Sequence, residues 1–153
     1  QERLQKVLRN YAMEYITSIV PETINVLGPE EGGHIAGAAA RLVGMHTFDE
    51  VAALLGGVEA GAAGFAKAFV RLSRGQDDDA ELALEGPRAS VRQTSWRLMA
   101  EREALSPAVF DAWNELWVGA ALAHDRFMRV EVTERRDRGD SHWGWQFRSA
   151  IRG

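Results

Sequence analysis

Large aromatic rings occupy every second position near the C-terminal end of the chain, at Trp143, Trp145 and Phe147. Alternate side chains of an extended strand point to opposite faces, so these rings share one face. A row of exposed rings is unfavourable in water. The segment is therefore predicted to be a strand of an antiparallel sheet whose ring-bearing face is covered by helices.

The same alternation marks three further strands. Residues 128–133 alternate apolar with polar side chains, and residues 137–140 supply the turn that leads into the aromatic strand. Residues 81–85 and 88–94 alternate on either side of Gly86–Pro87, which has the composition of a turn. Two hairpins, and with them a four-stranded antiparallel sheet, are predicted.

Helical periodicity dominates the first half of the chain. Apolar residues recur three or four positions apart before Pro21, at Leu4, Val7, Leu8, Tyr11, Ala12, Tyr15, Ile16 and Ile19. Pro21 is expected to stop or kink this helix at Val20, with a short turn following to Leu27.

A second helix is predicted from Pro29 to about Gly44, because proline and acids suit a first helical turn. Its small residues recur four positions apart, which lets another backbone approach closely, and one hypothesis is that this helix docks onto another chain. Thr47–Glu50 matches a capping box and predicts a third helix up to the Gly56–Gly57 break. Residues 58–74 carry the stripe of a fourth helix.

Ser106–Pro107 is a helix cap followed by a first-turn proline, so a long helix is predicted to Leu122. Residues 98–105 are compatible with helical or irregular structure. The predicted fold class is α+β: N-terminal helices and one long helix packed on a four-stranded antiparallel sheet of two hairpins, in a single domain over residues 1–153.

Composition excludes several classes of protein. The chain has no cysteine, which excludes disulfides, thiolate nucleophiles and zinc sites with sulfur ligands and favours a cytoplasmic location. Acidic residues exceed basic ones by four, and the basic residues are scattered except between Arg126 and Arg138, so nucleic-acid binding is not predicted. No apolar run is long enough to span a bilayer, and the first residues lack the apolar stretch of a secretory signal. We therefore expect no nucleic-acid partner and no membrane insertion.

Two stretches, LGPEEGGHIAGAAARLVG at residues 27–44 and VEVTERRDRGDSHWGWQF at residues 130–147, resemble L-2-amino-thiazoline-4-carboxylic acid hydrolase and, more distantly, 4-vinyl reductase sensor domains. Thr133, Gly139, Asp140 and Trp145 sit where those families place comparable residues. Trp143 stands near the position of an expected cysteine, so any chemistry that needs a thiol is lost. The resemblance implies a sheet covered by helices, a mostly apolar ligand pocket and a dimer.

Aromatic residues are the strongest candidates for a ligand pocket. Trp113 and Trp117 lie four apart on the long helix and share one face, as the three rings of the last strand do. Core packing explains such rings, and a pocket for a planar or aliphatic molecule is the alternative. The candidate substrate-binding residues are Trp113, Trp117, Trp143, Trp145, Phe147 and three polar residues: Tyr15 as part of a polar wall, and Arg129 and Arg148 as clamps for a carboxylate.

Candidate acids and bases are His46, His124 and Glu14, each of which also has a structural interpretation: a packed or capping histidine, a helix-terminal imidazole and an ordinary half-buried residue. Glu31 and His34 have the spacing of half a di-iron site, but no second such pair exists and a solvated helix start is favoured. We expect no metal and no cofactor.

Three functions remain open on this reading. The first is a hydrolase-like protein with an aromatic pocket that acts on a small carboxylate or aromatic compound without a thiol. The second is a ligand sensor, and the third is a structural subunit of a homo- or hetero-oligomer. The pocket reading is preferred, with a homodimer as the expected assembly and enzyme status left open.

Overall fold

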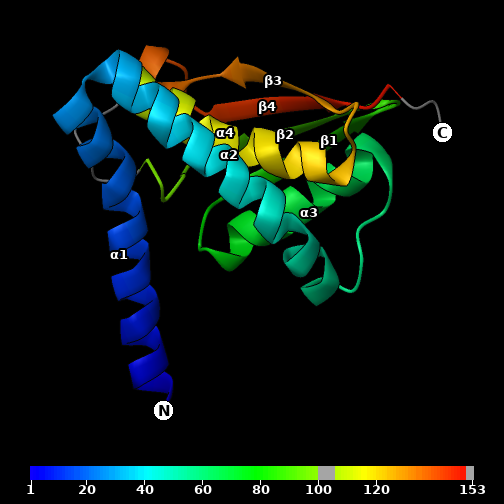
Figure 1. Ribbon diagram of the computed structural model, residues 1–153. Helices are drawn as coiled ribbons and strands as arrows, with labels where there is room; N and C mark the ends of the chain where they lie inside the picture. Colours follow the sequence, from blue (N-terminus) through cyan, green and yellow to red (C-terminus); the bar gives the residue numbers. More distant parts are fainter. Residues whose placement is uncertain (100–105, 151–153) are drawn as a thin grey trace.

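The computed structural model describes residues 1–99 and 106–150, in which helices and strands follow one another as drawn in Figure 1. The helices are α1 (Glu2–Leu27), α2 (Pro29–Leu54), α3 (Gly61–Gly75) and α4 (Pro107–His124). The strands are β1 (Ala80–Glu85), β2 (Arg88–Gln93), β3 (Arg129–Glu134) and β4 (Trp143–Arg148), with a short 3-10 turn, η1 (Arg136–Arg138), before β4. The predicted α+β fold is confirmed.

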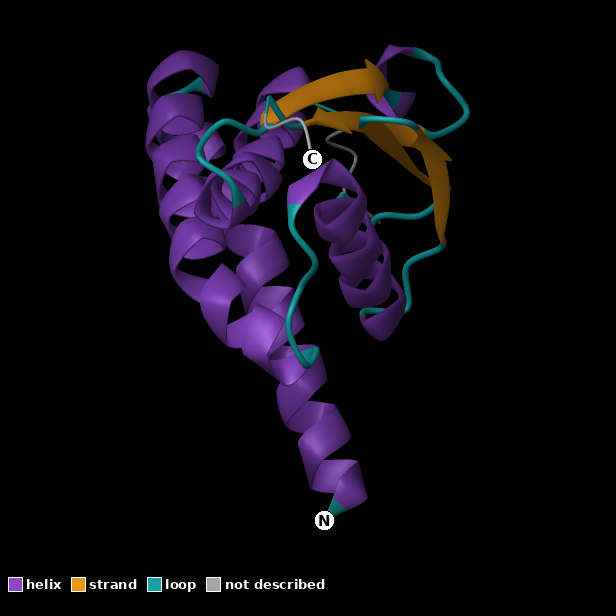
Figure 2. Ribbon diagram, turned by 90° about the vertical axis from the view of Figure 1, so that its right-hand side faces the viewer, coloured by secondary structure: helices purple, strands orange, loops and turns teal. Residues whose placement is uncertain are grey.

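The strands form one antiparallel sheet in the order β1-β2-β4-β3. Both predicted hairpins are present, and they join through β2 and β4. Trp145 of β4 lies between Val91 of β2 and Val132 of β3, so all three side chains point to the same, inner face. Figure 2 shows the twist of this sheet and the helices on that face.

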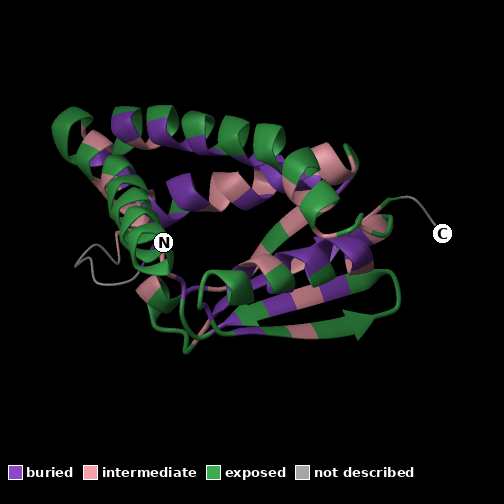
Figure 3. Cartoon of the chain, turned by 90° about the horizontal axis from the view of Figure 1, so that it is seen from below, coloured by how far each residue is buried: buried purple, intermediate pink, exposed green. Residues whose placement is uncertain are grey.

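The helices cover the sheet in layers. α3 and α4 lie on the inner face, and α2 runs along the other side of α4 (Figures 1 and 3). α1 contacts α2 and α4 near its C-terminal end, through the buried Val20 and Ile24. Its N-terminal half extends away from the rest of the molecule (Figure 1).

Small residues let α2 approach its neighbours very closely. The buried face of α2 consists of Gly32, Ala36, Gly37, Ala40, Gly44 and Phe48. A Cβ added to Gly44 would lie 2.0 Å from the carbonyl oxygen of Leu116, and one added to Gly119 would lie 2.1 Å from that of Arg41. The small-residue face that we expected to dock onto another chain is therefore occupied by α4 and α1 of the same chain.

The predicted helix end at Pro21 is wrong, because α1 continues through it to Leu27. Proline removes one backbone hydrogen bond from a helix at a cost of about 3 kcal/mol. Val20 and Ile24 on either side of it are buried in the core, and this packing offsets the cost.

The predicted capping box at Thr47–Glu50 is also wrong, because α2 continues to Leu54. The Thr47 hydroxyl donates to the carbonyl oxygen of Val43 at 2.7 Å, an interaction available within a helix. Gly44 and Phe48 extend the buried face of α2 past the expected break. The expected second and third helices are thus one helix, and the expected fourth helix is α3. Of residues 98–105, Leu98 and Met99 are buried and the rest lie outside the described residues.

Replacing Gly44 by alanine should destabilise the fold, because its methyl group would overlap the backbone of α4. We expect Gly44→Ala to lower the free energy of unfolding by on the order of 2–4 kcal/mol. Gly33→Ala is the matched control: it lies in the same helix, and an added Cβ meets nothing within 4 Å. That variant should be neutral or more stable by up to about 1 kcal/mol. Urea denaturation of both variants measures the difference, and equal effects would contradict the close approach of the helices.

Candidate functional site

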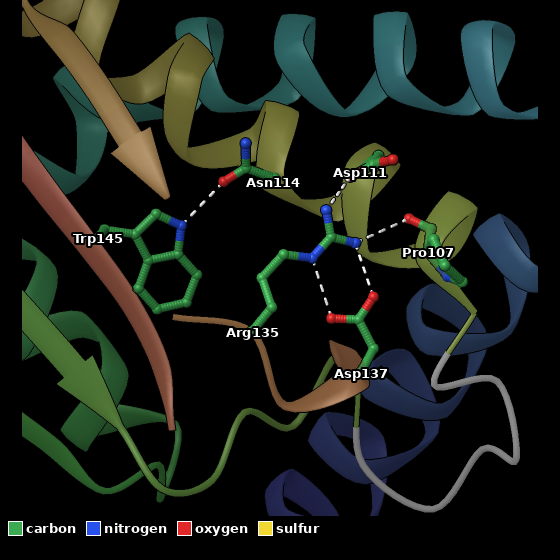
Figure 4. Close-up of polar contacts among 6 residues, drawn as sticks. All are labelled: Pro107, Asp111, Asn114, Arg135, Asp137 and Trp145. Atoms are coloured by element: carbon green, nitrogen blue, oxygen red, sulfur yellow. Dashed lines mark hydrogen bonds and ion pairs between the residues drawn. The ribbon is translucent and has the colours of Figure 1, made fainter. Parts of the chain in front are cut away.

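The predicted aromatic residues converge in the core. Trp113 and Trp117 of α4 and the three rings of β4 are all buried, with Trp145 and Phe147 fully so. The indole Nε1 of Trp145 donates to Oδ1 of Asn114 on α4 at 2.8 Å (Figure 4). The helix and the strand therefore do face one another, as the spacing predicted.

Other rings occupy the space between them. Phe69 of α3 stacks on Trp117 with ring centroids 3.5 Å apart and lies 5.2 Å from Trp145. Phe110 stacks on Trp143 at 5.0 Å. Contacts at these distances are those of a packed hydrophobic core. A ligand-binding role for the five predicted aromatic residues stays a prediction.

A buried arginine, Arg135, fastens the end of β3 to the start of α4 (Figure 4). Its guanidinium binds Asp137 at 2.7 Å and Asp111 at 2.8 Å, and it lies 4.1 Å above the ring of Phe110. A bidentate arginine with two carboxylates satisfies its charge inside a protein. Sequence reasoning missed this group, because RRDRGD indicates only a turn and Asp111 lies 24 residues away.

The candidate acid and base residues are not joined. His46 and Glu14 are exposed on α2 and α1. His124, at the end of α4, lies 3.1 Å from the carbonyl oxygen of Gly61 through Nε2 and is flanked by the rings of Phe48 and Phe65. Within the described residues, no hydrogen bond or ion pair links any two of the three. Their catalytic roles stay predictions.

The predicted arginine clamps lie on the outer face of the sheet, away from the aromatic core. In the strand register, Arg148 of β4 lies opposite Arg129 of β3 on one side and opposite Arg88 of β2 on the other, and all three are exposed. None of the three forms an ion pair with a described residue. In contrast, Arg92 on the same face binds Glu134 at 2.6 Å, and this hydrogen bond lowers the pKa of Glu134. Anion binding by Arg129 and Arg148 stays a prediction.

Removing Arg148, which lies between Arg88 and Arg129, should stabilise the protein, because like charges directly opposite each other on a sheet repel. We expect Arg148→Gln to raise the free energy of unfolding by roughly half a kcal/mol or more at low ionic strength, with the gain shrinking as salt is added. Arg92→Gln is the control on the same face: it should lower the stability, because it breaks the pair with Glu134. A gain that persists unchanged in molar salt would contradict the electrostatic cause. Thermal unfolding at two salt concentrations measures both effects.

Asp78, in the loop before β1, is the most perturbed acid of the described residues. It is only 6% exposed, and its Oδ1 accepts a hydrogen bond from the backbone of Arg97 at 2.8 Å while Oδ2 has no partner there. Burial raises the pKa of Asp78 to about 6, against the smaller opposing effect of the hydrogen bond from Arg97. Asp78 lies outside every predicted site.

The raised pKa of Asp78 makes stability depend on pH. Between the ordinary pKa near 3.8 and the folded value of about 6, the folded protein binds more protons than the unfolded chain, so this group makes stability fall as pH rises. Asp78→Asn removes the titration while keeping an acceptor for Arg97. We expect the wild type to lose on the order of 2 kcal/mol relative to the variant between pH 4 and pH 7. Urea denaturation across that range tests it, and parallel profiles would contradict the assignment.

A groove of about 770 Å³ runs between the N-terminal ends of α2 and α4. Gly33, Gly37 and Ala38 are among the residues that line it, with His34, Arg41 and Glu115. Arg41 and Glu115 pair at 2.8 Å across it. Glu31 and His34 are both exposed, and the described residues contain no group of acids and histidines that could hold a metal ion.

α1 carries an unusual amount of exposed apolar surface. With 3.6 residues per turn, the face that binds the body consists of Met13, Val20 and Ile24. The opposite face, which we call the α1 outer stripe, consists of Leu4, Val7, Leu8, Tyr11, Tyr15, Ile19 and Val26. The exposed fractions of these seven residues run from 50% for Ile19 to 77% for Val26. Most of the apolar residues whose spacing predicted this helix therefore face solvent.

The apolar area of the α1 outer stripe is large for a single chain. Seven large side chains at these exposures present on the order of 800 Å² of apolar surface, which the exposed Glu22 interrupts between Ile19 and Val26, and the largest patch on a typical monomer is about 300–600 Å². Residues 1–12 are exposed all round, so nothing in the described chain covers this part of the stripe. Large exposed apolar patches are often sites of interaction in proteins. No helix of the described residues is long and apolar enough to cross a membrane.

Comparison with known proteins finds a likeness among solved structures. No family model matches the chain, and no curated protein sequence matches it. Among solved structures, it is similar to the crystal structure of a trafficking protein particle complex subunit 3 from Naegleria fowleri covalently bound to palmitic acid. The TM-score is 0.68 at 16% sequence identity, over 94% of this chain and 95% of that chain. At this identity the likeness shows the fold alone.

This finding corrects the resemblance to the thiazoline hydrolase and 4-vinyl reductase families, which was wrong. The two stretches that carried the resemblance have structural explanations. Gly37 and Gly44 pack α2 on α4, Gly139 adopts a positive φ of 100° in the turn, and Trp143 and Trp145 fill the core. The hydrolase-like, ligand-binding function that rested on the resemblance is overturned with it, because the matching fold is that of a protein described as a complex subunit.

Proposed function

We propose that this protein is a structural subunit that joins a protein assembly through the α1 outer stripe. The observation that carries the proposal is the exposure of seven large apolar side chains along one face of α1, opposite the face that binds the body. A soluble chain gains by burying such a surface against another protein, since apolar burial contributes about 25 cal/mol per Å².

The fold likeness supports this proposal, since the similar structure is described as a subunit of a trafficking protein particle complex. The palmitic acid of that protein is not carried over: this chain has no cysteine to hold an acyl group as a thioester. The lack of cysteine also supports a cytoplasmic location. A homodimer and an assembly with other subunits both satisfy the proposal.

Charges placed within the stripe should dissociate the assembly. Leu8→Glu/Tyr15→Glu changes two exposed side chains, so the fold of the single chain should be preserved. Burying a carboxylate at an apolar interface costs on the order of 2 kcal/mol per site, or about 30-fold in affinity. We expect affinity purification from the native cell, followed by native mass spectrometry, to give an assembly for the wild type and a single chain for the variant.

The matched control is Leu84→Glu, which changes a side chain 49% exposed on β1, far along the chain from α1. It should leave the assembly intact. Circular dichroism should show all three proteins folded. Recovery of the wild type as a single chain, or an intact assembly of the double variant, would contradict the proposed function.

A further inference from the structure

We infer that the free edge of β1 binds an extended, basic segment of another protein, which joins the sheet as an additional antiparallel strand. β1 is an edge of the sheet in the strand order β1-β2-β4-β3. This surface is separate from the α1 outer stripe and goes beyond the proposed assembly role. The inference is carried by the open backbone groups of β1, the contrast with the other edge of the sheet, and the acidic side chains of β1.

The hairpin turn determines which backbone groups of β1 point away from β2. Gly86–Pro87 is a two-residue turn between Glu85 and Arg88, which are paired in the ladder. The carbonyl group of the first residue of a β-turn accepts from the amide of the fourth, so Glu85 and Arg88 form a hydrogen-bonded pair. Hydrogen-bonded and open pairs alternate along an antiparallel ladder. The residues whose N–H and C=O groups face the free edge are therefore Ala80, Leu82 and Leu84.

One position of this edge is occupied and two are open. The guanidinium of Arg74 on α3 donates to the carbonyl oxygen of Ala80 at 2.9 Å, which agrees with a carbonyl that points away from β2. Within the described residues, the edge-facing backbone groups of Leu82 and Leu84 have no hydrogen-bond partner. Residues 83–85 are exposed, so no described segment covers this part of the edge. Leu82 and Leu84 each offer one donor and one acceptor to an added strand.

The two edges of the sheet differ in their protection against strand addition. Edge strands of natural proteins are commonly blocked by a β-bulge, by proline or by basic side chains. β3, at the opposite edge, has a register shift between Val132 and Glu134 and carries Arg129. β1 pairs with β2 in unbroken register, and its sequence, AELALE, contains neither proline nor a basic residue. β1 is therefore the edge that is suited to pairing.

The charged residues of β1 determine which strand fits. Glu81 and Glu85 are exposed on the outer face, and neither forms an ion pair within the described chain. On β2, Arg92 lies opposite Glu81 and Arg88 lies opposite Glu85. Opposite charges on directly opposed residues stabilise a sheet, whereas like charges destabilise it. A strand with basic residues opposite Glu81 and Glu85 continues this alternation of charge across the sheet.

The same charges disfavour a second copy of β1 as the occupant. Antiparallel pairing with Ala83 opposite its own copy places Glu81 opposite Glu85 of the second copy, once on each side of the axis. The shifted register that places Glu81 opposite Ala83 requires the backbone of Ala80, whose carbonyl already binds Arg74. A basic segment of a different protein meets neither obstacle.

A synthetic peptide, SRVTVRS with blocked ends, tests the inference. In an antiparallel strand its valines lie opposite Leu82 and Leu84 and its arginines lie opposite Glu81 and Glu85. Valine and threonine favour extended structure. The peptide should bind the wild-type chain and slow hydrogen exchange at the amides of Leu82 and Leu84, as measured by NMR. No binding at millimolar peptide, or binding without protection of these two amides, would overturn the inference.

Methylation of backbone nitrogens in the peptide separates strand pairing from charge attraction. N-methylation of both valines removes the two donors that face β1, so the affinity should fall at least about 10-fold. N-methylation of the threonine and the second arginine is the matched control, because their N–H groups face solvent in an antiparallel strand. That peptide should keep its affinity. Equal losses would rule out strand pairing, and the reverse pattern would show a parallel strand and overturn the antiparallel arrangement.

Exchanging the charges tests the choice of partner. Glu81→Lys/Glu85→Lys should bind SRVTVRS roughly 2- to 30-fold more weakly than the wild type, because like charges then lie opposite each other. The same variant should bind the acidic peptide SEVTVES more tightly than the wild type does. A variant that had merely lost its fold would not gain affinity for the second peptide. Equal binding of both peptides by both proteins would contradict a basic partner.

Crosslinking distinguishes a partner segment from a second copy. The chain has no cysteine, so Ala83→Cys introduces a unique thiol on β1. A disulfide that forms between two such chains in solution and prevents peptide binding would show that a second copy occupies the edge and overturn the inference. Leu8→Glu/Tyr15→Glu should leave peptide binding unchanged, because the α1 outer stripe is a different surface. Loss of binding in that variant would contradict a site on β1.

Discussion

The close contact of α2 with α4 is the constraint on which the rest of the structure depends. Gly44 and Gly119 bring the two backbones together so closely that neither position has room for a side chain. α2 in turn fixes α1, because Gly32 lies against the backbone of Ile24 and a single residue, Gly28, joins the two helices. α1 is therefore held at its C-terminal end and directed away from the body (Figure 1). An arm held in this way cannot fold back to bury its outer side, so the outer stripe is a consequence of the glycine contacts.

The aromatic core holds α4 on the sheet. Trp145 is buried at the centre of the sheet and hydrogen-bonded to Asn114, and Arg135 ties the start of α4 to the turn before β4 (Figure 4). These polar contacts are directional, whereas the surrounding ring contacts are less so, and together they fix the orientation of α4. The rings that suggested a pocket therefore have a sufficient role in placing the helix on which α2 rests.

Much of the fold could be predicted from sequence, because it depends on local periodicity. Alternation at Trp143, Trp145 and Phe147 predicted the last strand and its buried face, and both hairpins followed from the same signal. The helix boundaries at Pro21 and Thr47 were wrong, because packing by Val20, Ile24 and Phe48 outweighs the local preference. The candidate site was harder to predict. Periodicity shows that α1 has an apolar stripe, but whether a stripe meets the core depends on where the neighbouring helices run. The pairing of Arg135 with Asp111 joins residues 24 positions apart, and no local pattern indicates it.

The exposed half of α1 also bears on how an assembly would form. Helices shorter than about 12–15 residues are marginal in water without tertiary contacts. Residues 2–12 have none, although they continue a helix whose other end is anchored by Val20 and Ile24 and so avoid the cost of nucleation. Pairing with a partner would add the missing contacts, and part of the binding free energy would then be spent on ordering this half of the helix. The affinity of the proposed assembly would therefore depend on helix propensity in residues 2–12 as well as on the apolar area. In that segment Leu4, Leu8 and the charged residues favour a helix, whereas Val7 and Tyr11 favour it less.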